Sequence, residues 1–387
     1  MKYKIGFWNY VKFGVLDIKS AVNDWEELGI NLAMSFEYDH EKNAREEMLL
    51  LLDECHKRNI KVIVCDTRSC FLNYIDHGAE KYKKDVETAV AEFGSHPAVY
   101  GFHIGDEPNK AQWDGAIEAY IICRDAAPDL IPFMNLLPYF LDGFENTVGV
   151  ERDKYAEKLE EFMVRTKAKV LSYDCYAQCA FFDRERWLEV YFKNLEIFYS
   201  VAKKFGAELF TSLLSVGHWA YRVPTEDDLR WQISTAIAHG VDGIMWFFIY
   251  ERDLDGSYRN SPIDLFWKRT DMFDKLARQN NTFNKYFAPL LEGYEFEKVE
   301  HYYTPYANVP DFKGNGILKE IKTVVNYTTF AVAYFKKGDK EGVILVNMSQ
   351  TEPSCICPEF TGALAKYNQN RWFAPGMMTV YTEEGCM

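Results

Sequence analysis

Short apolar runs alternate with longer amphipathic stretches over the first 290 residues of the chain. The apolar runs are rich in Val, Ile, Leu and Phe and mostly lack strict alternation with polar residues. This pattern is typical of parallel β-strands whose outer face is covered by helices. We expect strands over Lys4–Val11, Ile30–Tyr38, Lys61–Cys65, Val99–Gly105, Leu130–Leu137, Lys169–Tyr176, Glu208–Val216 and Gly243–Tyr250.

The amphipathic stretches between these runs repeat their apolar positions with the period of an α-helix. Thr225 is followed by three acidic residues, a pattern typical of a helix N-cap and first turn, and Gly29, Gly206 and Gly240 directly follow predicted helix ends. We expect helices over Ile18–Leu28, Ala44–Arg58, Lys84–Phe93, Ala111–Ala126, Asp153–Thr166, Arg184–Phe205, Thr225–His239 and Pro262–Tyr286.

Eight strand–helix units in a row are typical of two architectures, a closed barrel and a doubly wound open sheet. A doubly wound sheet that binds a dinucleotide has a glycine-rich loop after its first strand. Here the first strand ends in bulky residues, Phe7-Trp-Asn-Tyr10, where such a loop would need glycines. The sequence therefore predicts an α/β fold with a (β/α)8 TIM barrel over residues 1–292.

After Gly293 the helical period stops. Thr323–Val332 and Val343–Met348 indicate antiparallel strands, and the segment Lys337–Lys340 between them has the composition of a turn. We expect a small β-sandwich-like accessory domain over residues 293–387. No low-complexity linker precedes this region, so we expect it to pack against the barrel.

Composition and charge indicate which kinds of molecule the protein is not expected to bind. The 387 residues are 48% hydrophobic and 26% charged, which is ordinary for a globular protein. The 44 Lys and Arg against 58 Asp and Glu give a net charge of −14, and no basic cluster is present. The longest apolar run, Ile244–Tyr250, is far shorter than the ~20 residues of a membrane-spanning helix. We therefore expect neither nucleic acid nor membrane as a partner, and the oligomeric state is left open.

Nine cysteines are scattered along the chain without a CxxC pair, so a zinc site is not expected. The His-x-His that many barrel metalloenzymes carry after their first strand is also absent. The N-terminal segment has neither the long apolar run nor the cleavage-site pattern of a signal peptide. We expect reduced thiols in a cytoplasmic protein that uses no metal or other cofactor.

Barrel enzymes place their active sites at the C-terminal ends of the strands. Aromatic residues make up 16% of the chain, and many lie at these ends together with histidines and carboxylates. Aromatic side chains can stack on sugar rings, although a high aromatic content also fits an ordinary core. For His103 a core position is an equal alternative, and for Trp246 it is the default. We expect the substrate to contact Trp8, Asn9, Glu37, Asp66, Arg68, His103, Asn135, Tyr176, His218, Trp219, Trp246 and Glu251.

The most specific signal is the sequence Asp106-Glu107-Pro108 at the end of the fourth predicted strand. Pro108 ends the strand because it lacks a backbone donor. Strand alternation places Glu107 on one face and Asp106 on the other. The same residues would suit an acidic turn before the helix predicted from Ala111. Their position at a strand end favours a catalytic role.

This motif resembles the strand-four motif of clan A glycoside hydrolases, which include the family 42-type β-galactosidases. Pro224–Gln232 and Ala238–Trp246 also resemble the seventh-helix to eighth-strand stretch of proteins assigned to that group. The resemblance covers the barrel, about three quarters of the chain. It implies cleavage of a glycosidic bond with Glu107 as the general acid/base. The clan also has a nucleophile glutamate at the end of strand seven, but the matching segment here, Thr211–Trp219, contains no carboxylate.

Glycoside hydrolysis normally uses two carboxylates, about 5–5.5 Å apart for retention and ~6.5–9.5 Å apart for inversion. The partner of Glu107 must therefore come from another strand end. We favour Asp174, at the end of the sixth predicted strand, because inward residues of alternate strands share a layer in these barrels. Glu251 and Glu37 are weaker candidates for the same role.

Asp106 is the alternative second catalytic group. An adjacent Asp-Glu pair resembles the barrel hexosaminidases, in which the aspartate orients the acetamido group of the substrate as the nucleophile. On that interpretation Tyr176 and Trp246 would line the acetamido pocket. Both carboxylates of the pair would then have to face the pocket, which needs a local bulge in the strand.

Three functions are compatible with these patterns. The leading hypothesis is a glycoside hydrolase that acts on a carbohydrate substrate. A non-catalytic carbohydrate-binding barrel is the second, supported by the missing glutamate of strand seven. A barrel lyase that uses the same carboxylates for proton transfer is the third.

Overall fold

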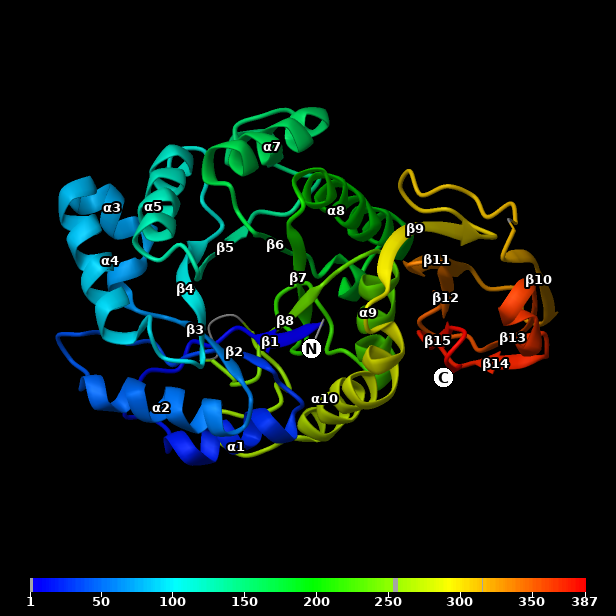
Figure 1. Ribbon diagram of the computed structural model, residues 1–387, viewed down its shortest axis with the longest axis horizontal. Coiled ribbons are helices and arrows are strands. Elements are labelled where there is room, and N and C mark those ends of the chain that lie inside the picture. Colours follow the sequence, from blue (N-terminus) through cyan, green and yellow to red (C-terminus); the bar gives the residue numbers. More distant parts are fainter. Residues whose placement is uncertain (1–2, 253–256, 315) are drawn as a thin grey trace.

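The computed structural model describes residues 3–252, 257–314 and 316–387 of the chain. Within these ranges, eight parallel strands close into a barrel in chain order, and the eighth pairs back onto the first (Figure 1). The prediction of an α/β fold with a (β/α)8 TIM barrel is confirmed. The barrel strands are β1 (Lys4–Phe7), β2 (Leu32–Met34), β3 (Lys61–Val64), β4 (Val99–Asp106), β5 (Ile131–Leu136), β6 (Val170–Asp174), β7 (Glu208–Leu214) and β8 (Gly243–Phe247).

Helices surround the barrel on its outside (Figure 1). The predicted cap is present, because the Thr225 side chain accepts a hydrogen bond from the backbone N–H of Asp228. Gly29, Gly206 and Gly240 have φ angles of 73°, 66° and 84°, the left-handed conformation that often ends a helix. The helices are α1 (Ile18–Glu27), α2 (Arg45–Lys57), α3 (Phe71–His77), α4 (Ala79–Phe93), α5 (Trp113–Ala126), α6 (Phe144–Val148), α7 (Tyr155–Thr166), α8 (Arg184–Phe205), α9 (Glu226–Ala238) and α10 (Asp271–Thr282).

Some helical details differ from the prediction. α10 begins at Asp271 instead of Pro262, because Thr270 caps it by accepting the backbone N–H of Met272. α3 and α6 lie in the loops after β3 and β5, where no helix was predicted. Their seven and five residues are too few to show a helical period.

The C-terminal part of the chain forms two antiparallel sheets, with strand orders β15-β12-β11-β9 and β10-β13-β14. Between them lies a separate apolar core that includes Leu318, Val332, Leu345 and Ile356, as expected of a sandwich-like arrangement. The strands are β9 (Glu295–Tyr302), β10 (Leu318–Val325), β11 (Phe330–Lys337), β12 (Lys340–Asn347), β13 (Ser354–Phe360), β14 (Arg371–Phe373) and β15 (Met378–Tyr381).

The predicted single strand Thr323–Val332 is wrong. It covers the end of β10 and the start of β11, and Asn326 between them has a φ of 54°, which an extended strand does not allow. The predicted turn is correct, since Lys337 pairs with Lys340 across the β11–β12 hairpin. The domain boundary between residues 292 and 293 stays a prediction.

The four-stranded sheet packs beside the barrel, next to α9, and the three-stranded sheet lies on its outer side (Figure 1). Gln350, in the loop after β12, donates a hydrogen bond to the carbonyl of Gln178 in the loop after β6 (2.9 Å). His239, at the end of α9, meets His301 of β9 with 3.0 Å between the two Nε2 atoms. All four side chains are buried.

The described residues contain no helix that is both long and apolar enough to cross a membrane. The nine cysteines are free thiols. In the same ranges, no group of three or more His, Cys, Asp or Glu side chains is arranged to hold a metal ion.

Candidate active site

A cavity of about 490 Å³ opens at the C-terminal ends of the barrel strands, and aromatic side chains form most of its walls. Eight predicted site residues line it, namely Trp8, Asp106, Glu107, Asn135, Asp174, Tyr176, His218 and Trp219. The other lining residues are Tyr10, Leu137, Pro138, Phe140, Trp187, Tyr221, Phe247, Arg252 and Tyr258.

Three carboxyl groups meet in this cavity. Glu107 and Asp174 form a hydrogen bond with each other through their side chains. The side-chain amide of Asn135 donates to Asp106 (3.1 Å) and to Asp174 (2.8 Å). Its oxygen accepts from the hydroxyl of Ser172 (3.0 Å), which turns the NH₂ group toward the carboxylates. The three carboxyl groups are therefore one connected cluster.

The backbone at the end of β4 brings both adjacent carboxylates into the cavity. The register against β5 shifts by one residue between His103 and Gly105, which is the signature of a β-bulge. Glu107 has a φ of 45°, and its N–H is held by the carbonyl of Asn135 (2.9 Å). Both side chains line the cavity, so the expectation that Asp106 and Glu107 face opposite sides is wrong, because β4 ends at Asp106 and Glu107 leaves the extended conformation.

Gly105 is required by this geometry. Its φ is 154°, a value that side-chain-bearing residues rarely adopt. A Cβ atom at this position would lie 2.2 Å from a ring carbon of Phe71. The aromatic ring thus packs directly on the backbone beneath the carboxylates, and only glycine fits there.

The cluster retains a proton near neutral pH. The negative charge of Asp174, followed by burial and the charge of Asp106, raises the pKa of Glu107 to about 10. Burial, with repulsion from Asp174, raises the pKa of Asp106 to about 7. Burial also raises the pKa of Asp174, but the hydrogen bonds from Glu107 and Asn135 oppose this rise. Glu107 therefore holds its proton and donates it in a hydrogen bond to Asp174.

The walls above the carboxylates are aromatic and rigidly packed. Tyr176 stacks on Phe247 with 5.1 Å between ring centres. His218 is 3% exposed, and its Nδ1 has no hydrogen-bond partner among the described residues. Burial lowers the pKa of His218 to about 4, so its imidazole is neutral. The Arg252 guanidinium lies over the ring of Tyr10, 4.2 Å from its centre.

Asp66 and Arg68 do not line the cavity. Arg68 donates to both carboxylate oxygens of Asp66 (3.0 and 2.7 Å) and to Glu92 (2.6 Å). This buried ion pair joins the loop after β3 to α4. Both charged groups have protein partners here, and substrate contact by Asp66 and Arg68 stays a prediction.

Asn9, Glu37 and Glu251 also lie outside the cavity lining. The amide of Asn9 donates to the carbonyl of Met34 (3.1 Å) and is buried. Glu37 pairs with Lys12 (3.3 Å) at the surface. The carboxylate of Glu251 accepts from the hydroxyl of Ser261 (2.9 Å), which ties the loop after β8 together. Substrate contact by these three residues stays a prediction.

Trp246 points away from the barrel axis. Its indole N–H donates to Asn280 of α10 (3.0 Å), and the side chain is fully buried between strands and helices. Phe247, the next residue along β8, reaches the cavity instead. His103 lies in the barrel interior, edge-on to Trp8 (5.7 Å between ring centres), and does not line the cavity.

Some lining residues were not predicted from the sequence. Tyr10 and Arg252 lie in the strand-end segments that already stood out for their aromatic and charged residues, so local signals for them exist. Phe247 follows from strand alternation once Trp246 is assigned to the helix side. Trp187 lies in α8 and is distant in sequence from any strand end, although its side chain reaches the cavity. No local sequence pattern marks it.

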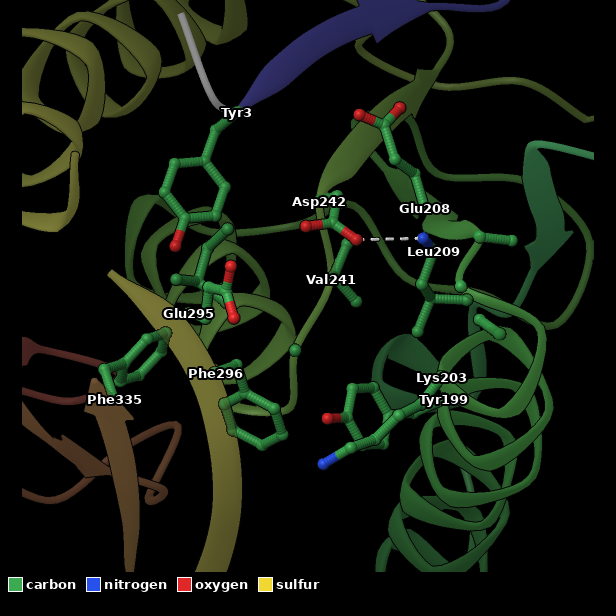
Figure 2. Close-up of a pocket in the computed structure, with 15 residues that line it drawn as sticks. Tyr3, Tyr199, Lys203, Glu208, Leu209, Val241, Asp242, Glu295, Phe296 and Phe335 are labelled. Atoms are coloured by element: carbon green, nitrogen blue, oxygen red, sulfur yellow. Dashed lines mark hydrogen bonds between the residues drawn. The ribbon is translucent and has the colours of Figure 1, made fainter. Parts of the chain in front are cut away.

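A second cavity, of about 410 Å³, lies at the opposite end of the barrel (Figure 2). Tyr3 and Asp242, which precede β1 and β8, line it together with Glu208 at the start of β7. Asp242 accepts the backbone N–H of Leu209 (3.0 Å), and Glu208 pairs with Lys4 (2.7 Å). The N-terminal end of a barrel serves stability and not catalysis, so this cavity is not the candidate site.

No protein-family model matches the sequence, and no curated protein matches it. The fold is similar to that of several solved structures. The β-galactosidase of the psychrophilic Marinomonas ef1 aligns with a TM-score of 0.55 over 73% of this chain and 59% of its own, at 11% identity. The β-galactosidase of the Antarctic haloarchaeon Halorubrum lacusprofundi gives 0.55 over 73% and 58%, also at 11% identity.

A putative α-L-fucosidase from Bacteroides thetaiotaomicron aligns with a TM-score of 0.52 over 72% of this chain and 96% of its own, at 15% identity. The chain thus spans less than two thirds of either β-galactosidase. At these identities the similarity shows a shared barrel fold.

Proposed function

We propose that the protein is a glycoside hydrolase in which Glu107 protonates the glycosidic oxygen. The observation that carries this proposal is that Glu107 lies beside Asp174 and Asp106 in an aromatic cavity at the C-terminal ends of the barrel strands, where their charges and burial raise its pKa. A general acid must hold its proton until the leaving group departs. The names of the compared structures, two β-galactosidases and a putative α-L-fucosidase, support the same reaction class.

Asp174 is the proposed second carboxylate. Asp174 accepts the proton of Glu107 in their side-chain hydrogen bond, which places the two carboxyl groups side by side in the cavity. A bound glycosidic oxygen replaces Asp174 as the acceptor of this hydrogen bond. The Asp174 carboxylate is then free to face the anomeric carbon or a water molecule. Trp8, Asn135, Tyr176, His218 and Trp219 are proposed to contact the substrate.

A second candidate mechanism uses Asp106. The favouring observation is that Asp106 faces the cavity beside Glu107 and is joined to Asp174 through Asn135. In this mechanism the carbonyl oxygen of a 2-acetamido group on the substrate attacks the anomeric carbon. Asp106 accepts the amide N–H of that group, and Glu107 again protonates the leaving oxygen.

Hydrolysis of nitrophenyl hexosides and their N-acetyl counterparts separates the two mechanisms. If Asp174 is the second group, Asp174→Asn loses at least ~10²-fold in kcat while plain hexosides are substrates of the wild type. Cleavage of N-acetyl substrates alone, with Asp174→Asn unimpaired and Asp106→Asn inactive, would select the acetamido mechanism. Sugar-dependent thermal stabilisation without turnover on any glycoside would identify a binding protein and refute the hydrolase.

A further inference from the structure

Three large aromatic side chains lie exposed next to the candidate active site. Phe181 is 55% exposed, Phe182 76% and Trp219 68%. Trp219 also lines the cavity, and Phe181 and Phe182 lie in the loop that pairs with the turn carrying Trp219. We refer to Phe181, Phe182 and Trp219 as the aromatic rim.

The rim is built from two loops that pair with each other. Ala180, after β6, forms an antiparallel bridge with Tyr221, after β7. The N–H of Phe181 donates to the carbonyl of Ala220 (3.1 Å). Arg259 donates to the carbonyl of Tyr221 (2.8 Å), and its guanidinium lies 6.0 Å from the ring centre of Phe181. The exposed rings are therefore carried by a hydrogen-bonded framework.

The backbone of Trp219 is in a conformation that tryptophan rarely adopts. The backbones of His218 and Tyr221 exchange two hydrogen bonds (3.1 and 2.8 Å), so Trp219 and Ala220 form a two-residue hairpin turn. Trp219 has a φ of 43° at the first turn position, where such turns favour glycine or asparagine. Strained backbone conformations of this kind cluster at ligand-binding and active sites. The turn projects the indole to the surface instead of burying it.

We propose that the aromatic rim binds the leaving-group part of the substrate as a sugar ring, so that the substrate is at least a disaccharide. This inference rests on the proposed hydrolase and specifies its substrate class. The apolar C–H face of a sugar ring complements the exposed aromatic faces, and the rim is continuous with the cavity that holds Glu107. A monosaccharide in the cavity would leave the rim uncovered.

The test compares glycosyl fluorides with disaccharides of the same glycon, for glucose, galactose, fucose and N-acetylglucosamine. Fluoride is too small a leaving group to reach the rim. We expect Trp219→Ala to lower the ratio of kcat/KM for disaccharide over fluoride by about tenfold or more, and Trp219→Phe to restore part of it. Phe182→Ala should lower the ratio in the same direction. Phe266→Ala is the control, because Phe266 is 79% exposed but belongs neither to the cavity lining nor to the two paired loops after β6 and β7.

Equal loss on both substrate types in Trp219→Ala would overturn the rim as a sugar site. Calorimetric binding of mono- and disaccharides to Glu107→Gln gives a readout that does not depend on turnover. If Glu107→Gln binds disaccharides more tightly than monosaccharides and the double variant Glu107→Gln/Trp219→Ala does not, the result supports the rim as a sugar-binding site. This holds even if the wild type hydrolyses none of the glycosides. Absence of any such preference in Glu107→Gln contradicts it, whether or not the wild type is active.

Discussion

At the scale of single residues, the cavity holds three carboxyl groups against a single lining cation. Among the described lining residues that cation is Arg252, which stacks on Tyr10. Burial raises the pKa of all three acids, and the charge of Asp174 raises the pKa of Glu107 and Asp106 further. The site therefore binds a proton more tightly than the unfolded chain does, which suits the proposed general acid and lowers stability at neutral pH.

The first prediction concerns stability. The pKa of Glu107 rises from 4.5 to about 10 on folding, so its contribution favours folding at low pH and is lost as pH rises from about 4.5 to about 10. Glutamine cannot ionise, yet its amide can still donate to Asp174. Glu107→Gln should raise the free energy of unfolding by at least about 1 kcal/mol at pH 8, and by less at pH 4.5. A stability gain that does not grow with pH in urea titrations would contradict this account of the cluster.

The second prediction concerns the pH dependence of the reaction. Activity should fall at alkaline pH as the cluster loses the proton held on Glu107. Asp106 contributes negative charge that raises the pKa of Glu107, so Asp106→Asn should move the alkaline limb of kcat/KM to lower pH by up to about one unit. An alkaline limb that stays in place or moves upward would show that Asp106 does not act electrostatically on the acid.

At the scale of elements, the site depends on one irregularity in β4. The bulge between His103 and Gly105 and the positive φ of Glu107 place adjacent carboxylates on the same side. Gly105→Ala would force a methyl group into the ring of Phe71. We expect this substitution to lower the free energy of unfolding by about 2 kcal/mol or more. Gly316→Ala is the control, since a Cβ there meets no atom within 4 Å, and equal stability of the two variants would contradict the requirement for glycine.

The strands and helices could be predicted because apolar residues recur along each of them with the spacing typical of that element. Strand and helix runs, the Thr225 cap and the Lys337–Lys340 turn are local patterns, and the structure shows them. The bulge could not be predicted, because it depends on how β4 pairs with β5 and on the Phe71 ring from another element. The same limit applies to Trp246, whose orientation is decided by its contact with α10.

The candidate site was predictable to the extent that it lies at strand ends. Glu107 and Asp174 could be identified because the barrel brings all strand ends to one rim. Asp66 and Arg68 have the same kind of position but neutralise each other. Whether a charged residue is free for a substrate depends on its spatial partners, and the sequence around it does not specify them.

At the scale of the whole molecule, a histidine pair joins the barrel to the C-terminal sheets. The Nδ1 of His239 faces the carbonyl of Thr235 (2.7 Å), so it carries a hydrogen, and the Nδ1 of His301 accepts the N–H of Tyr306 (3.1 Å). The 3.0 Å contact between the two Nε2 atoms is then one N–H donating to one acceptor. Both rings are neutral in this arrangement, and a further proton would set two N–H groups against each other.

Low pH should therefore weaken the contact between His239 and His301 and lower the stability of the protein. Tyr306, which packs on His301, donates its hydroxyl to Glu185, and no charged partner of the histidine rings appears among the described residues. Burial lowers the pKa of His239 to about 4 and lowers that of His301 well below its usual value. Their contribution to stability is complete above about pH 6.5 and is lost as pH falls toward 4, by up to about 1.4 kcal/mol per pH unit for each histidine.

Urea unfolding between pH 7.5 and 4.5 measures this loss. The double variant His239→Gln/His301→Gln should lose stability less steeply than the wild type over this range. His77→Gln removes an exposed histidine and should keep the wild-type slope. Parallel curves for the wild type and the double variant would show that the pair is not responsible for acid sensitivity.

The central claim is that Glu107 is the general acid, and leaving-group dependence tests it most directly. The measurement is kcat/KM of Glu107→Gln relative to the wild type on an unactivated disaccharide and on the dinitrophenyl glycoside of the same sugar. A dinitrophenolate leaves without protonation, whereas a sugar alkoxide does not. We predict a loss of at least ~10²-fold on the disaccharide and a much smaller loss on the dinitrophenyl glycoside. Equal losses on the two substrates, or full activity on the disaccharide, would contradict the assignment of Glu107 as the acid.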